Sequence, residues 1–188
     1  MNIINTKLAG VKILEPKIFG DPRGYFFESW NRQRYSDAGI DCNFIQDNES
    51  SSHFGVLRGL HYQAAPYTQA KLVRVIQGTV LDVVVDIRHG SPTFGEHLAI
   101  ELNSEDKRQL FVPRGFAHGF AVLSEKTIFS YKCDNQYMPS HERGIAFDDP
   151  ALGIDWRIAI EQMILSEKDR KNPNLTNAEI LENGGCKP

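Results

Sequence analysis

The sequence has few cysteines. Only Cys42, Cys133 and Cys186 occur among its 188 residues, and no two of them form a C-x-x-C pair. An odd number of widely spaced thiols argues against a disulfide framework and against a zinc site built of thiolates. We therefore expect reduced thiols and a cytoplasmic protein.

Long apolar runs and a strong excess of one charge are also missing. No stretch has the length that a transmembrane helix needs, and the N-terminal MNIINTKLAGVKILEP lacks the pattern of a signal peptide. The formal net charge is −3 and the pI is about 6.1, which predicts no general attraction to nucleic acid or to membranes. An anionic ligand would need a local cluster of Lys and Arg.

The chain does contain a series of short β-rich runs separated by glycine and proline. Its length suits one domain with a full hydrophobic core, and we expect a single domain over residues 1–188. Many short strands at this spacing predict an all-β sandwich or barrel. The expected strands lie within GYFFESW (24–30), FGVLRGLHYQ (54–63), KLVRVIQGTVLDVVVDIR (71–88), HLAIEL (97–102), QLFVPRGFAHGFAVL (109–123) and KTIFSYKC (126–133).

Helix signals concentrate near the end of the chain, so we expect a few short helices and a helical tail over residues 170–188. In LTNAEIL (175–181), Thr176 is the expected N-cap and Glu179 follows three residues later, which is a capping box. Two glycines at 184–185 are then expected to end that helix.

Two histidines, His61 and His118, lie in expected strands that could face one cavity. The stretch PRGFAHGF around His118 fits the P-x-G-x-x-H pattern of the second cupin motif, which indicates a cupin-like jelly-roll barrel. The first cupin motif supplies H-x-H and then a glutamate, whereas His61, Tyr62 and Gln63 stand here and no glutamate follows before Gly78. Because a catalytic metal generally needs at least three ligands, we expect the barrel without a metal.

A carboxylate could accompany these histidines inside the barrel. In VLDVVVD, Asp82 shares one face of the strand with Val84 and Asp86. An ionised carboxylate that points into a barrel needs a partner, and a nearby histidine would serve, with its pKa raised. The alternative is that both histidines are ordinary hydrogen-bonded core residues.

Arg58 and His61 stand three residues apart, so strict alternation places them on opposite faces of a strand. Gly59 lies between them and would permit a bulge that re-aims one side chain. We predict a local irregularity at this point if both residues serve one site. Otherwise Arg58 is simply a solvated residue on the outer face.

Tyr131 and the Lys168–Asp169 pair each have a structural interpretation. Tyr131 shares a strand face with Phe129 and Cys133, which is typical of a core residue, although a buried hydroxyl needs a polar partner. Lys168 and Asp169 are adjacent in LSEKD, and alone they indicate only a charge pair on the surface.

Taken together, these segments resemble the dTDP-4-dehydrorhamnose 3,5-epimerases, cofactor-free enzymes that act on nucleotide sugars. The resemblance implies a cupin-like β-barrel and a homodimer in which N-terminal residues contribute to the neighbour's site. The matching stretches run in order from about residue 19 to residue 169: FGDPRGYFFE (19–28), FIQDNESSS (44–52), GVLRGLHYQ (55–63), QAKLVRVIQGTVLDVVVDIR (69–88), SPTFG (91–95), VPRGFAHGFAVLSE (112–125), YKCDNQY (131–137), GIAFDDPALGIDW (144–156) and LSEKD (165–169).

The resemblance also implies roles for single residues. His61 would be the base, held by Asp169, and Tyr131 would be the acid on the opposite face of the sugar. Lys71 would stabilise the oxyanion that forms at O4, although Ala70 precedes it where the family usually has glycine. The residues expected to bind the nucleotide sugar are Arg23, Glu28, Gln46, Asp47, Asn48, Arg58, His118, Tyr137, Glu142 and Lys168.

The implied reaction is epimerisation at C3 and C5 of dTDP-4-dehydro-6-deoxy-D-glucose through enolates, without a cofactor. The nearest alternative is a mono-epimerase that acts at C3 or C5 only. A metal-dependent cupin oxygenase and a non-catalytic module that binds sugar nucleotides are alternatives from other classes. No nucleic acid or membrane partner is expected.

Overall fold

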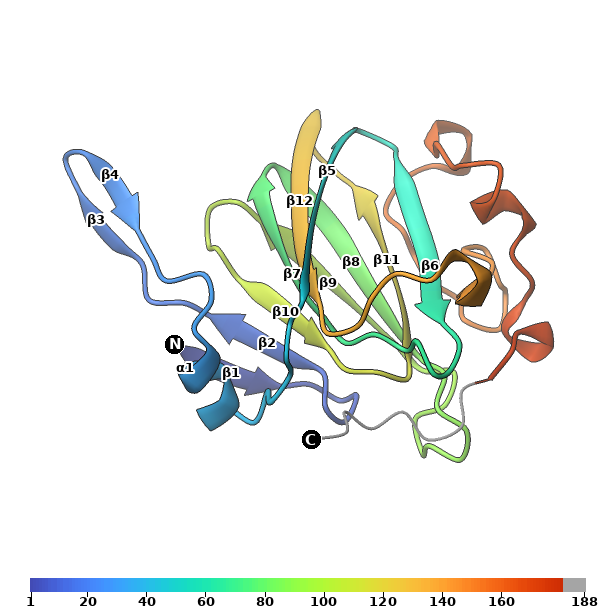
Figure 1. The fold of residues 1–188 in the computed structure, drawn as a ribbon. Helices are drawn as coiled ribbons and strands as arrows, with labels where there is room; N and C mark the ends of the chain where they lie inside the picture. The colour runs from blue at the N-terminus through green and yellow to red at the C-terminus, as the bar shows by residue number, and fades with distance from the viewer. Residues whose placement is uncertain (181–188) are drawn as a thin grey trace.

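A computed structural model describes residues 1–180, and the glycines at 184–185 lie outside the described residues. Two antiparallel sheets face each other as a β-barrel of the jelly-roll type, as expected (Figure 1). In spatial order, the six-stranded sheet contains β1 (Asn2–Asn5), β2 (Lys12–Glu15), β10 (Gln109–Val112), β7 (Lys71–Gln77), β12 (Lys126–Cys133) and β5 (Gln46–His53). The five-stranded sheet contains β13 (Glu142–Gly144), β6 (Leu57–Gln63), β11 (Phe116–Val122), β8 (Thr79–Asp86) and β9 (His97–Asn103).

The remaining elements are short. A hairpin of β3 (Phe19–Asp21) and β4 (Gly24–Phe26) projects away from the barrel (Figure 1). Within residues 1–180 the one α-helix is α1 (Arg32–Asp37), and no helix there is long and apolar enough to cross a membrane. The 3-10 turns are η1 (Pro139–His141), η2 (Ile160–Gln162), η3 (Asp169–Lys171) and η4 (Leu175–Asn177).

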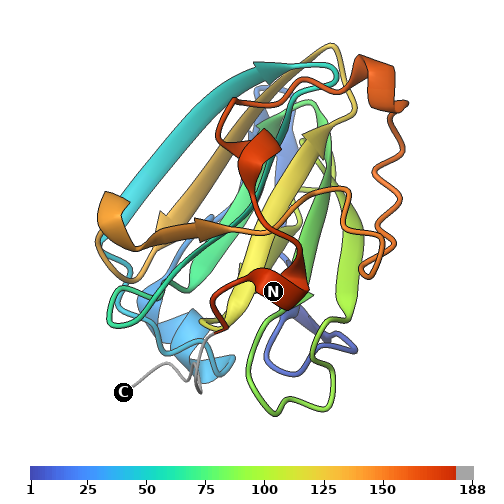
Figure 2. The ribbon, with the colours of Figure 1, turned by 90° about the vertical axis from the view of Figure 1, so that its right-hand side faces the viewer.

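Strand β8 is buried on both faces. Its residues Leu81, Val83 and Val85 pack under the C-terminal segment, which crosses the outer face of the five-stranded sheet (Figure 2). Val80 and Val84 point the other way, into the core between the two sheets. The alternation predicted for this strand is therefore confirmed, and it places Asp82 on the inner face.

The helix expected to start at Thr176 does not form in the part of the tail that the structure describes. Between residues 172 and 180 there is one 3-10 turn, Leu175–Asn177, and its N-cap is Asn174, not Thr176. The Glu179 carboxylate, expected to close a capping box, instead pairs with Arg143 at 2.6 Å. Its backbone carbonyl accepts a hydrogen bond from the Tyr62 hydroxyl at 2.7 Å. These contacts with the barrel replace the local hydrogen bonds on which a helix depends.

Candidate active site

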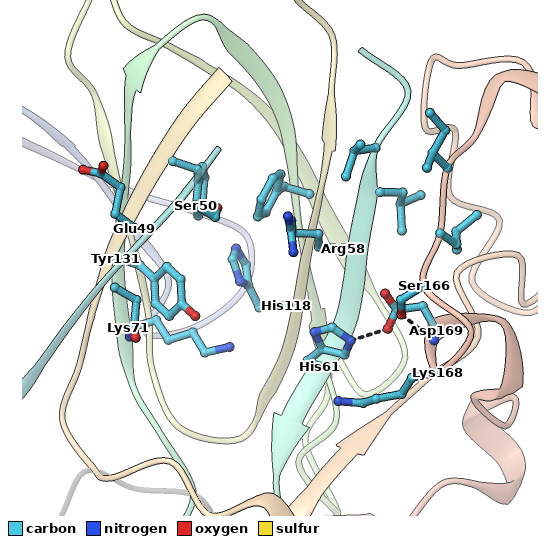
Figure 3. Close-up of a pocket in the computed structure, with 17 residues that line it drawn as sticks. Glu49, Ser50, Arg58, His61, Lys71, His118, Tyr131, Ser166, Lys168 and Asp169 are labelled. Carbon is cyan, nitrogen blue, oxygen red and sulfur yellow. Dashed lines mark hydrogen bonds and ion pairs between the residues drawn. The ribbon is translucent and has the colours of Figure 1, made fainter. Parts of the chain in front are cut away.

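A cavity of about 590 Å³ opens between the two sheets at the end covered by the segment 164–169 (Figure 3). Its lining includes His61, Lys71 and Tyr131, which come from β6, β7 and β12. A second hollow of about 350 Å³ shares these three side chains. The two hollows therefore form one cleft around the residues that the resemblance implied for catalysis.

His61 is paired with a carboxylate from a distant part of the chain. Its Nε2–H donates to Oδ1 of Asp169 at 2.5 Å, which leaves Nδ1 as the ring nitrogen with a lone pair. Burial acts to raise the pKa of Asp169, but hydrogen bonds from His61 and Ser166 outweigh it and hold that pKa below the ordinary value. The Asp169 carboxylate therefore stays ionised and fixes both the tautomer and the orientation of the ring.

The predicted irregularity between Arg58 and His61 is confirmed. In the pairing of β6 with β11, His61 lies opposite His118 and Arg58 lies opposite Phe120. Between these pairs β6 contains one residue more than β11, which is a β-bulge. Gly59 takes φ +129°, and a Cβ there would lie 2.5 Å from the Cα of Gly119. As a result Arg58 and His61 line the same cavity (Figure 3).

Lys71 and Tyr131 approach the cavity from the six-stranded sheet. The Lys71 ammonium lies 5.9 Å from the centre of the Tyr131 ring and extends toward His61 (Figure 3). Burial lowers the pKa of Lys71, although Cys133, Asp82 and Glu142 counteract it. Burial also raises the pKa of Tyr131, so its hydroxyl keeps its proton. The cleft thus holds a base, a cation and a proton donor.

The other polar groups of the cleft lie around its rim and floor. His118 is buried and pairs with Asp82, the carboxylate for which the strand pattern suggested a histidine partner without indicating which one. At the rim, the Tyr137 hydroxyl donates to Glu142 at 2.5 Å, and the same carboxylate forms an ion pair with Lys168. Gln46 and Asn48 of β5 line the same cleft.

The local interpretation of Lys168 and Asp169 as one surface charge pair is wrong. Lys168 is half-exposed and pairs with Glu142, whereas Asp169 is 4 % exposed and pairs with His61. The 3-10 turn η3 begins at Asp169 and directs the two neighbouring side chains to different partners.

Three expected binding residues do not line the cavities around His61 in this chain. Arg23 is exposed at the tip of the β3–β4 hairpin, where it pairs with Asp21 at 2.6 Å. Glu28 precedes α1, and Asp47 pairs with Lys132 at 2.7 Å. Their expected role would therefore require another molecule or a rearrangement of the chain.

Two serines that the sequence analysis missed orient site residues. The Ser52 hydroxyl accepts hydrogen bonds from Arg58 Nε at 3.2 Å and Nη2 at 3.1 Å. Ser166 Oγ accepts from the backbone N–H of Asp169 at 3.1 Å. The S-x-x-D spacing of Ser166 and Asp169 was the one available signal, because such side chains often bond to backbone groups nearby.

Within residues 1–180, no group of three or more His, Cys, Asp or Glu side chains is placed to hold a metal ion. The side chains that could ligate are instead engaged in pairs. His61 faces Asp169 and His118 faces Asp82.

Comparison with known proteins gives one consistent result. The chain matches the family model for dTDP-4-dehydrorhamnose 3,5-epimerase over residues 5–177. It is 49% identical over 182 residues to the dTDP-4-dehydrorhamnose 3,5-epimerase of Shigella flexneri, covering 96% of this chain and 99% of the relative.

Solved structures agree with the sequence matches. A dTDP-6-deoxy-D-glucose-3,5-epimerase from Legionella pneumophila, in complex with dTDP-4-keto-L-rhamnose, is 49% identical with a TM-score of 0.94 and covers 98% of this chain and 99% of its own. A 3'-monoepimerase from Streptomyces bikiniensis, in complex with dTDP-quinovose, is 35% identical with a TM-score of 0.86, covering 91% and 86%. The chain therefore belongs to the dTDP-4-dehydrorhamnose 3,5-epimerase family of isomerases.

Proposed function

We propose that this chain inverts both C3 and C5 of dTDP-4-dehydro-6-deoxy-D-glucose, giving dTDP-4-dehydro-L-rhamnose. The observation that carries the proposal is the convergence of the His61–Asp169 pair, the Lys71 ammonium and the Tyr131 hydroxyl on one cavity. The names of the relatives supply the substrate class.

The chemistry needs these groups and no redox step. The keto group at C4 acidifies the hydrogens on C3 and C5, because the carbanion is delocalised onto O4 as an enolate. His61 Nδ1 removes the hydrogen, and a placed base of this kind contributes roughly 10²–10⁴-fold. Lys71 stabilises the negative charge on O4, and Tyr131 delivers a proton to the opposite face of the same carbon.

The remaining residues of the cleft suit a nucleotide diphosphate. Arg58 presents a planar guanidinium to the cavity, and this group can engage two phosphate oxygens at once. Tyr137 is 49% exposed at the rim, where its ring can stack on the base. Gln46, Asn48, His118, Glu142 and Lys168 supply further polar contacts.

We further propose a homodimer in which the β3–β4 hairpin reaches the partner's cleft. The hairpin projects from the barrel and exposes Phe19, Tyr25 and Phe26. Arg23 at its tip would then bind the substrate diphosphate of the neighbouring subunit, and Glu28 would follow it. We place the enzyme in the cytoplasm, in keeping with the absence of a cysteine pairing motif.

A mono-epimerase is the second candidate, because the 3'-monoepimerase from Streptomyces bikiniensis shares this fold. Turnover of the 4-keto-6-deoxy sugar nucleotide in D2O separates the two by NMR. Deuterium at both C3 and C5 of the inverted product supports the double epimerase, and deuterium at one carbon overturns it. His61→Ala should abolish exchange while retaining binding, and unchanged exchange in that variant would favour a different catalytic group.

A further inference from the structure

The segment that carries Asp169 has little regular structure of its own, and it lies along the segment 142–149. The Lys168 ammonium pairs with Glu142 at one end. Further along, the N–H of Ala146 donates to the carbonyl of Pro173 at 2.8 Å. Residues 142–149 therefore contact and support the segment whose turn holds the Asp169 carboxylate.

Gly144 lies within this stretch, directly beside His61. It is the residue of β13 that pairs in register with His61 of β6. A Cβ at Gly144 would lie 2.4 Å from the Cγ, Oδ1 and Nδ2 atoms of Asn172, closer than Cβ atoms approach other groups. Its φ is outside the left-handed region, so the space and not the backbone conformation requires glycine.

We propose that Gly144 is a positioning residue for the His61–Asp169 pair, because a side chain at this position would displace the side-chain amide of Asn172 and, with it, η3. This inference rests on the proposed catalytic role of that pair. Asn172 follows η3 directly, and only two residues separate it from Asp169. An outward shift of Asn172 is therefore transmitted to the carboxylate.

The effect of such a shift on catalysis follows from the geometry. Asp169 holds His61 through one contact of 2.5 Å, and its turn is a single 3-10 turn with no helix to stiffen it. A misplacement of about 1 Å in a catalytic arrangement can cost on the order of 10²-fold in rate. A methyl group on Gly144 should therefore lower kcat through the orientation of His61.

A double-mutant cycle on Gly144 and Asn172 tests this proposal. Gly144→Ala should lower kcat at least about tenfold with a smaller change in KM, and it should weaken the NMR signal of the His61 Nε2–H that Asp169 holds. Asn172→Ala should keep most of the activity. The double variant should recover most of the kcat lost by Gly144→Ala, because the new methyl group occupies the space of the missing amide.

Arg170→Ala is the matched control, since its exposed side chain is on the same turn, and it should behave like the parent. Three results would overturn the proposal: full activity in Gly144→Ala, a double variant no better than Gly144→Ala, or lost activity with an unchanged His61 signal. Asp169→Asn keeps the two proposals separate. If Asp169→Asn turns over normally, the proposed role of the pair fails. If it is impaired while Gly144→Ala is not, only the positioning role of Gly144 fails.

Discussion

His118 Nε2 lies 2.9 Å from Oδ1 and 3.0 Å from Oδ2 of Asp82, and both side chains are buried between the sheets. The ring N–H thus donates to a carboxylate that has no exposed surface. This pair sits on adjacent strands, β11 and β8, where Phe120 and not His118 is the register partner of Asp82. The contact is therefore diagonal across the inner face, and His118 also lines the cleft.

Removal of this carboxylate should destabilise the protein. Asp82→Ala leaves the buried N–H of His118 without its acceptor, which costs about 1–3 kcal/mol in the free energy of unfolding, and the cavity adds to the loss. Asp82→Asn keeps an acceptor oxygen in place and should lose less. Urea denaturation measures both variants, and an Asp82→Ala protein as stable as the parent would refute this account of the pair.

Lys71 should contribute to activity at the expense of stability. Burial lowers its pKa, so the folded protein binds this proton less tightly than the unfolded chain does. At pH values below the lowered pKa of the folded protein, the free energy of unfolding is therefore reduced. It recovers as the pH rises from this lowered pKa toward the pKa of an ordinary lysine. At neutral pH, Lys71→Met should raise Tm while turnover falls roughly 10²–10³-fold.

The exposed Lys126 on β12 supplies the matched control for that substitution. Lys126→Met should change neither turnover nor Tm appreciably. A Lys71→Met protein with a lower Tm than the parent would show that the contacts of the ammonium stabilise the fold by more than its desolvation costs.

The alkaline limb of the pH–rate profile should report Lys71 and not Tyr131. Burial lowers the pKa of Lys71 and raises that of Tyr131, so the lysine loses its proton first as the pH rises. The decrease in kcat/KM should therefore begin at a lower pH than that at which an ordinary lysine titrates. In Lys71→Arg, whose side chain stays charged, the residual activity should persist to higher pH. An unshifted limb in this variant would assign the titration to another group.

Much of the barrel could be predicted from the sequence because its strands are apolar on at least one face. β12 alternates and its burial broadly follows the pattern, whereas β8 is a nearly continuous apolar run that is buried on both faces. β5 was missed, since QDNESSSH contains no apolar residue. It is a strand because β12 pairs with it along its whole length, and as an edge strand it presents polar side chains to the cleft and to solvent.

The His61–Asp169 pair shows a different limit of sequence reasoning. His61 stood out because a histidine interrupts an apolar strand, whereas nothing local marks Asp169 as its partner. The two residues are 108 positions apart, and only the course of the C-terminal segment brings them together. The role of Asp169 came from the resemblance to a family. The fit of Asn172 against Gly144 has no local signal either.

The bulge at Gly59 is one local feature that could be anticipated, and it is directly testable. Gly59→Ala would place a methyl group 2.5 Å from the Cα of Gly119 and force an alanine to φ +129°. The conformational strain alone costs about 1–3 kcal/mol. We expect a lower Tm and a loss of turnover, because Arg58 and His61 no longer aim at one cavity. Parent-like turnover in a folded Gly59→Ala protein would show that the bulge does not position them.

Tyr131→Phe should separate hydrogen removal from inversion. His61 would still abstract the hydrogen and Lys71 would still stabilise the enolate, but the opposite face of the sugar would lack its proton donor. The His61 side chain is 26% exposed, so its captured proton can exchange with solvent before it returns to the same face. In D2O the recovered starting sugar should therefore acquire deuterium without inversion, while product formation falls on the order of 10²-fold or more.

NMR of the recovered substrate and of the product measures the two processes in one sample. The hydroxyl is the only group removed by this substitution, and the ring still packs beside Lys71 and Phe129. A Tyr131→Phe enzyme that inverts at the parent rate would exclude the hydroxyl as the proton donor. Loss of exchange as complete as in His61→Ala would instead indicate that Tyr131 acts in hydrogen removal, because a missing donor leaves the abstraction step intact.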